Sequence, residues 1–254
     1  MGFVPVILML LFTLAMEFLV VATTNVWVRG AIAATIGIIG ATVIFRVIRL
    51  AIFRLDIISL ELKQGSRGAT VGLAVGLIVS ITCGLLFCFL HGEPITGSFV
   101  AVVQPVRFLQ NLGPALIEEA SMRAGVVHML NGLHGPWAGL AGGSLPFGLL
   151  HLFGRIFGNP VGIPHVIGTT ASGLLLSILY LRFGFWAALS CHWIWNSLAG
   201  TWVRYAGVTS RDGMQQFEGA VETVVVLVIA SACLLVIGDK RWLGSVTTQA
   251  DRRR

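Results

Sequence analysis

The chain has 254 residues, of which 56% are hydrophobic and only 11% charged, and its mean hydropathy is +0.89. A soluble domain carries about 25% charged residues, so this chain lacks the polar surface that a soluble protein of its length needs. The composition therefore predicts a multi-pass α-helical membrane protein. The 31 glycines agree with this prediction, because small residues let membrane helices pack closely.

Lys and Arg outnumber Asp and Glu by 17 to 11, which gives a net charge of +6. Much of the excess lies in two regions, from Arg46 to Arg67 and from Lys240 to Arg254. Membrane proteins carry such clusters on cytoplasmic loops. Neither region interleaves basic and aromatic residues on a soluble domain, so we expect a lipid bilayer and no nucleic acid as partner.

Candidate membrane spans follow one another along the chain, each an apolar stretch near the 20 residues that a span requires. They are residues 3–24, 31–53, 70–90, 112–131, 136–153, 163–181, 183–203 and 219–238. The first three and the last are plainly apolar, whereas the middle four are shorter and are broken by Gly, Pro and polar residues. Residues 91–111 are expected to form a loop with an interfacial helix. We therefore expect an all-α fold, with residues 1–254 as one polytopic bundle of about eight spans.

The two ends of this bundle can be assigned from the charges. Residues 1–24 contain no basic residue, so we interpret them as a first span and not as a signal peptide. An even number of spans places both basic regions on the same side, which the positive-inside rule makes cytoplasmic. The four cysteines fall within apolar runs and are interpreted as buried thiols: Cys83, Cys88, Cys191 and Cys233.

A pair of adjacent glutamates lies in one of the broken middle spans. Burying an ionisable group at membrane depth costs several kcal/mol unless the group is paired or hydrated, so such residues are expected to have a specific role. On a helix, Glu119 and Arg123 share a face and can neutralise each other. Glu118 points about 100° away, which leaves it without a partner on its own helix and available as a general base. The structural alternative is that both acids pair with Arg123 or with another helix.

Two histidine motifs follow in later spans. Phe147 and His151 share a helix face, so the ring can wall the imidazole, although a lone membrane histidine is more often a packing residue. His192 and Asn196 also lie one turn apart, and two hydrogen-bond donors projecting together could stabilise an oxyanion. The alternative for this pair is an ordinary hydrogen bond between helices.

The predicted depths of these clusters in the membrane support the interpretation that they form one site. Glu118 lies near the start of its span and His151 near the end of the next. His192 and Asn196 fall in the middle to late part of a third span, so all four residues are expected toward one side of the bilayer. A base, a second histidine and oxyanion donors are the groups needed to attack an amide with water. The sequence also leaves open a Zn²⁺ site formed by Glu118, His151 and His192.

The three motifs in this order resemble the signature of the CPBP intramembrane proteases, also called the Abi family, which includes the type II CAAX prenyl endopeptidases. The family pattern is EExxxR, FxxxH and HxxxN, and the chain reads EEASMR (118–123), FGLLH (147–151) and HWIWN (192–196). The region from about 112 to 203 carries the resemblance and is the expected catalytic core. The resemblance implies a helical bundle around a polar intramembrane cavity.

The resemblance also implies roles for the motif residues. Glu118 and His151 would activate a water molecule, and His192 and Asn196 would stabilise the oxyanion, in a glutamate-type mechanism without a cofactor. Supporting residues would be Glu119, Arg123 and Phe147.

We therefore expect an intramembrane endopeptidase in the cell membrane of a prokaryote, with both termini cytoplasmic and a protein or peptide substrate. The alternatives are a non-catalytic immunity or scaffold protein of the same fold and, less favoured, a transporter or proton relay. CAAX processing is cytosolic, but the charge count puts the Glu118 end of its span on the other side. For this reason prenylated proteins are not predicted as the substrate.

Overall fold

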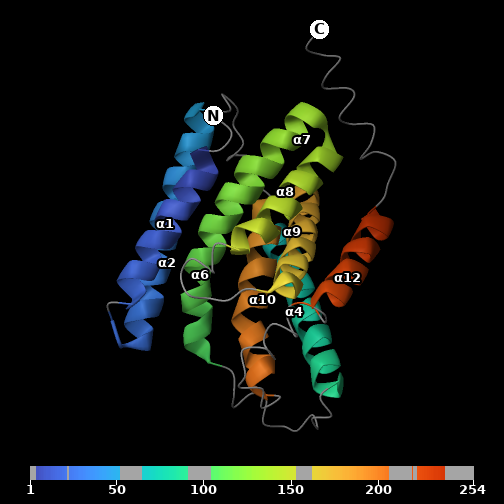
Figure 1. The fold of residues 1–254 in the computed structure, drawn as a ribbon. Coiled ribbons are helices and arrows are strands. Elements are labelled where there is room, and N and C mark those ends of the chain that lie inside the picture. Colours follow the sequence, from blue (N-terminus) through green and yellow to red (C-terminus); the bar gives the residue numbers. More distant parts are fainter. Residues whose placement is uncertain are drawn as a thin grey trace.

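The computed structural model describes residues 4–21, 23–51, 65–90, 104–152, 162–205, 219 and 222–237, and the predicted all-α bundle is confirmed (Figure 1). Its helices are α1 (Val4–Val21), α2 (Val26–Ala51), α4 (Gly65–Leu90), α6 (Pro105–Glu119), the π-helical η1 (Ala120–Val127), α7 (His128–His134), α8 (Pro136–Leu150), α9 (Ile163–Phe183), α10 (Phe185–Tyr205) and α12 (Glu222–Ile237).

Each predicted span coincides with a helix in the described residues, with α6, η1 and α7 forming one continuous rod. Three described helices are long and apolar enough to cross a membrane by themselves: Val26–Ile48, Gly65–Leu90 and Ile163–Phe183. Two shorter apolar helices lie at Val4–Met16 and Thr223–Ala232. The span predicted at 163–181 is therefore plainly apolar, although it was grouped with the weaker middle spans.

The fourth rod begins earlier than predicted, at Pro105 and not near residue 112. Proline favours the first turn of a helix, where its missing N–H is not needed. Residues 105–111, assigned to a loop region, therefore belong to α6, while residues 91–103 lie outside the described part of the chain. Glu118 consequently lies roughly 20 Å along this rod and not near its start. The sequence-based prediction that the motif residues lie toward one side of the bilayer therefore used a wrong start for this helix.

Glycines at two helix contacts allow backbones to approach closely. Gly72 of α4 faces α10, and a Cβ at this position would collide with the carbonyl oxygen of Ala187. Gly113 of α6 faces α2, where a Cβ would collide with the carbonyl oxygen of Ala33. The pairs α4–α10 and α2–α6 are the most extensive helix contacts among the described residues. These two contacts hold α6 and α10, which carry two of the three motifs, inside the bundle.

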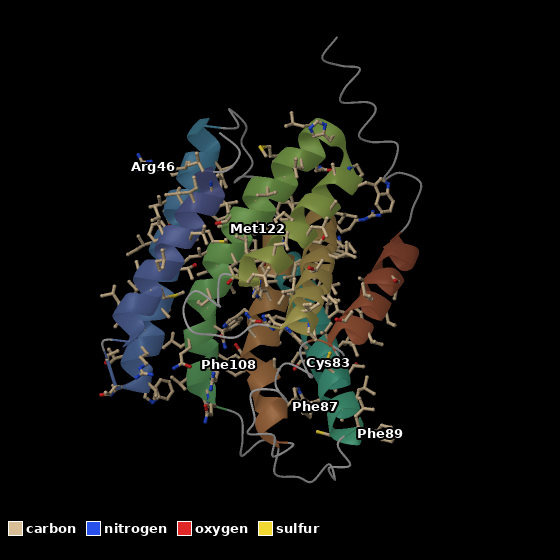
Figure 2. The ribbon with its side chains drawn as sticks, viewed as in Figure 1. Arg46, Cys83, Phe87, Phe89, Phe108 and Met122 are labelled. Carbon is tan, nitrogen blue, oxygen red and sulfur yellow. The ribbon has the colours of Figure 1, made fainter. Side chains whose placement is uncertain are left out.

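The outer surface of the bundle is apolar, as expected of helices that face lipid. Phe89 is 80% exposed and points outward at the end of α4 (Figure 2). Ile7, Ile38 and Val228 are also exposed on α1, α2 and α12. The prediction of buried cysteines is confirmed for the three whose side chains are described, since Cys83, Cys88 and Cys191 are all buried.

Replacing Gly72 by alanine is expected to destabilise the protein by roughly 1–3 kcal/mol, because the added methyl group overpacks the α4–α10 contact. The matched control is Gly132→Ala, since nothing lies within 4 Å of a Cβ built at Gly132. This control is expected to be neutral or slightly stabilising. Thermal unfolding of the purified proteins in detergent measures both effects, and equal melting temperatures for the two variants would contradict the close packing described.

Candidate active site

The first motif lies where α6 passes into the wider helix η1. Glu118 and Glu119 close α6, and Arg123 follows in η1, which has seven buried residues of eight. Short π-helical segments inside α-helices occur frequently at functional sites. The sequence analysis assumed a uniform α-helix here, because no simple residue pattern distinguishes a π-helical turn.

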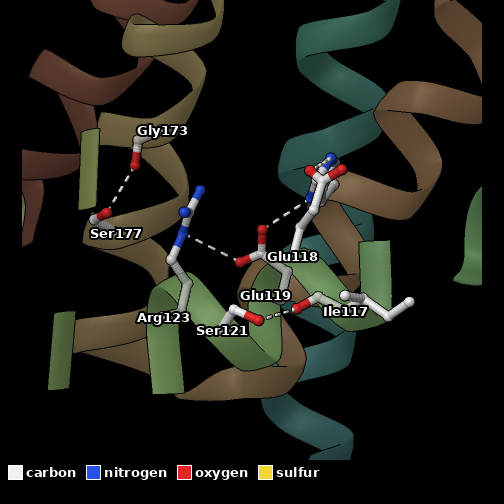
Figure 3. Close-up of polar contacts among 8 residues, drawn as sticks. Ile117, Glu118, Glu119, Ser121, Arg123, Gly173 and Ser177 are labelled. Carbon is white, nitrogen blue, oxygen red and sulfur yellow. Dashed lines mark hydrogen bonds and ion pairs between the residues drawn. The ribbon is translucent and has the colours of Figure 1, made fainter. Parts of the chain in front are cut away.

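Glu119 and Arg123 form the predicted ion pair. Arg123 Nε lies 3.2 Å from Glu119 Oε2, and both side chains are 0% exposed. Figure 3 shows this pair beside Ser121, whose hydroxyl donates to the Ile117 carbonyl oxygen at 2.8 Å. A buried charge is tolerated only when it is paired, so each member of this pair requires the other.

The rest of the Arg123 guanidinium faces an aromatic ring. Its central carbon lies 4.6 Å from the centroid of the Phe147 ring, a distance typical of a cation–π interaction. Within the described residues, Arg123 Nη1 and Nη2 have no hydrogen-bond partner. Glu119 and the Phe147 ring are therefore the main electrostatic partners of this buried cation.

His192 of α10 lies between the two glutamates. Its Nδ1 is 2.8 Å from Glu119 Oε1 and its Nε2 is 3.7 Å from Glu118 Oε2. A carboxylate only accepts, so we assign a proton to Nδ1, which donates to Glu119. The result is a buried relay from Arg123 through Glu119 to His192, which fixes the imidazole and directs Nε2 toward Glu118.

The two glutamates differ in exposure as well as in partners. The side chain of Glu118 is 23% exposed, whereas that of Glu119 is 0% exposed. The Glu118 carboxylate is therefore partly accessible from outside the protein. This difference agrees with the sequence-based division into a structural glutamate and one available for chemistry.

The ring of Phe147, in the second motif, contacts His192 of the third motif. Its ring centroid lies 4.9 Å from that of His151 and 5.9 Å from that of His192, both edge-on. The predicted wall beside His151 is confirmed, and the ring also contacts His192 and Arg123. His151 Nδ1 lies 2.8 Å from the Phe147 carbonyl oxygen, so Nδ1 carries the proton and leaves the Nε2 lone pair as a proton acceptor.

Asn196 lies one turn after His192 on α10 and is half-buried. Its backbone carbonyl accepts a hydrogen bond of 3.2 Å from Asn111 Nδ2 of α6. A second bond of 2.6 Å, from Trp193 Nε1 to the Phe108 carbonyl oxygen, joins the same two helices. The role of the Asn196 side chain as an oxyanion donor stays a prediction.

The sequence analysis did not single out His165, whose ring centroid lies 5.4 Å from that of His151. His165 is half-buried near the start of α9. A histidine inside a predicted span was a usable signal, because ionisable residues in spans mark functional sites. Asn111 and Trp193 were also missed, since only the tertiary contact between α6 and α10 reveals their bonds.

The zinc alternative concerns the side chains of Glu118, His151 and His192. No three His, Cys, Asp or Glu side chains in the described parts of the chain gather closely enough to hold one metal ion. The zinc alternative at Glu118, His151 and His192 stays a prediction.

Comparison with known proteins gives one family match. Residues 100–198 match the family described as type II CAAX prenyl endopeptidase Rce1-like, a family of proteases. No curated protein and no solved structure matches the chain. The matched range contains all three motifs, from Glu118 to Asn196. Residues 100–198 therefore match the type II CAAX prenyl endopeptidase Rce1-like family, in agreement with the resemblance of the three motifs.

Proposed function

We propose that this protein is an intramembrane endopeptidase of the glutamate type, which hydrolyses a peptide bond in a membrane-associated substrate. The observation that carries the proposal is the arrangement around Glu118. This partly exposed carboxylate lies beside His192, whose other nitrogen is held by the buried Glu119–Arg123 pair. The range from about 112 to 203 is the proposed catalytic core.

In the proposed first step, Glu118 and His151 together activate a water molecule, and Glu118 accepts its proton. The lone pair on His151 Nε2 is available because Nδ1 donates to the Phe147 carbonyl oxygen. The water oxygen then bonds to the scissile carbonyl carbon. A positioned acid–base group of this kind contributes about 10²- to 10⁴-fold in rate.

The attack moves an electron pair onto the carbonyl oxygen. His192, protonated on both nitrogens, and the Asn196 side-chain amide would donate hydrogen bonds to this oxyanion. The tetrahedral intermediate then collapses, the C–N bond breaks, and the proton held by Glu118 passes to the departing amine. Because His192 is oriented by Glu119, its donor is preorganised before the substrate arrives.

The substrate class follows from the bilayer and from the reaction. A bundle with an apolar outer surface presents its site to peptides or proteins that lie in or at the membrane. The matched family is named after CAAX prenyl endopeptidases. Our proposal for this chain is a peptide bond in a protein or peptide substrate, and it does not include a prenyl group.

The variants Glu118→Ala and His151→Ala are each expected to reduce peptide cleavage by at least about 10²-fold, because each removes a proton acceptor. The matched control is His134→Ala, an exposed histidine at the end of α7, which should retain wild-type activity. Cleavage of a membrane-protein substrate by purified protein in detergent measures the effect. Wild-type cleavage by Glu118→Ala would contradict the proposed role of Glu118 as the general base.

The Glu119–Arg123 pair is expected to act as a unit in stability. Glu119→Gln and Arg123→Gln should each destabilise the protein by roughly 3–5 kcal/mol, because each leaves a buried charge unpaired. The double variant should lose clearly less than the sum of the two. Unfolding measured for all four proteins of this cycle in detergent checks the coupling, and additive losses would show that the two side chains are independent.

Chelation distinguishes the proposed mechanism from a zinc mechanism. Cleavage should continue at an unchanged rate after dialysis against EDTA, because the proposed acid–base and oxyanion groups belong to the protein. Complete loss of activity that returns on addition of Zn²⁺ would instead assign Glu118, His151 and His192 to a metal. The rate of peptide cleavage before and after metal addition is the measurement.

A further inference from the structure

A second polar site lies away from the three motifs. A half-open cavity of about 420 Å³ lies between α1, α2 and α6, at the end of the bundle where α2 and α6 begin. Its polar lining consists of Arg29, Gln104, Arg107, Gln110 and Asn111, and its other lining residues are apolar. The lining contains no acidic side chain among the residues that the structure describes.

The two arginines of this cavity are bonded to neutral oxygens. Arg29 Nε donates to the Thr23 carbonyl oxygen at 2.5 Å, and Arg107 Nε donates to Gln104 Oε1 at 3.4 Å. In the described part of the chain, neither guanidinium has a carboxylate within ion-pair distance. Among the described residues around the cavity, none compensates either positive charge.

The helix ends add to this positive field. Arg29 lies in the first turn of α2, after Val26, and Arg107 lies in the first turn of α6, after Pro105. The first turn of a helix carries the positive end of its dipole, so a basic residue there is locally unfavourable. Neither helix has an acidic residue in its first turn to offset this.

Two arginines, each in the first turn of a helix, thus line one cavity with no described counter-charge. At α2 the N–H groups of Trp27 and Val28 already donate to Asn25 Oδ1, so the arginines and the start of α6 are the available anion-binding groups. Sequences that break a local rule in this way often do so for a binding function. The missing component is an anion, because both helix N-termini and arginine forks bind phosphate well.

We propose that this cavity binds a phosphate group. Arg29 and Arg107 would hold its oxygens in bidentate hydrogen bonds, and Gln104 and Gln110 would donate further bonds. The cavity is larger than a phosphate ion needs and falls within the usual range for small-molecule sites. Its apolar lining suits the glycerol and acyl part of a phospholipid, although free phosphate shares the same recognition chemistry.

The position in the bundle agrees with a lipid headgroup. The membrane-span candidate Val26–Ile48 begins with a residue of the cavity lining. The cavity therefore lies at the end of a hydrophobic span, which is the level of the lipid headgroups. Arg46 lies near the other end of α2, roughly 25 Å from Arg29 along the helix axis. In Figure 2, Arg46 and Phe108 of α6 lie toward opposite ends of the bundle.

The test uses the full-length protein in nanodiscs of phosphatidylcholine, with and without phosphatidylglycerol, and separately with inorganic phosphate. Native mass spectrometry counts retained lipids, and the melting temperature reports phosphate binding. We expect wild-type protein to retain phosphatidylglycerol about tenfold more than phosphatidylcholine, and Arg29→Gln plus Arg107→Gln together to abolish this preference. The exposed Arg46→Gln on the same helix is the matched control and should behave as wild type.

Further arms identify the source and guard against misfolding. Stabilisation by phosphatidylglycerol alone assigns the site to a lipid headgroup, and stabilisation by inorganic phosphate alone assigns it to a free anion. Arg107→Lys keeps the charge and should retain part of the preference, whereas a folding defect would not be relieved in this graded way. Equal retention of both lipids with no effect of phosphate, or unchanged retention in the double variant, would overturn the proposal. Glu118→Ala should retain the lipid normally, which separates this site from the proposed peptidase activity.

Discussion

The arrangement of the polar centre depends on one buried cation. Arg123 is 0% exposed in a bundle whose outer surface is apolar, and a charge in such a place must be neutralised within the protein. Glu119 supplies the opposite charge, and the Phe147 ring covers the guanidinium. Since Glu119 is committed to this pair and to His192, Glu118 is the glutamate whose side chain stays partly exposed. The division of labour between two adjacent identical residues thus follows from electrostatic pairing.

Close helix packing gives this polar centre a rigid frame. Gly72 and Gly113 bring backbones together at the α4–α10 and α2–α6 contacts, where any larger residue would collide. Between those contacts, α6 and α10 are joined by the hydrogen bond from Trp193 to the Phe108 carbonyl and by the ion pair of His192. A hydrolase needs its acid, base and oxyanion donors preorganised. Here the preorganisation comes from helix backbones that cannot move apart independently.

The proposed active site and the proposed phosphate site share helix α6. Asn111 lines the cavity and also donates to the backbone carbonyl of Asn196, a predicted oxyanion residue. One side chain therefore connects the headgroup level of the bundle with the motif-bearing part of α10. A lipid at the cavity would contact the same segment that supports the chemistry.

The sequence by itself determined the membrane environment, the helical fold and the three motifs, because hydrophobic length and residue spacing are local properties. It also determined the Glu119–Arg123 pair, since a spacing of four residues brings side chains together on one helix. Only the tertiary structure decided that His192 lies between both glutamates, that Phe147 contacts three site residues and that His165 lies beside His151. These contacts join different helices, and no spacing within one helix specifies how helices are packed. The start of α6 at Pro105 was missed for a related reason: its first turns are polar where they line a cavity between α1, α2 and α6, so hydropathy did not reveal them.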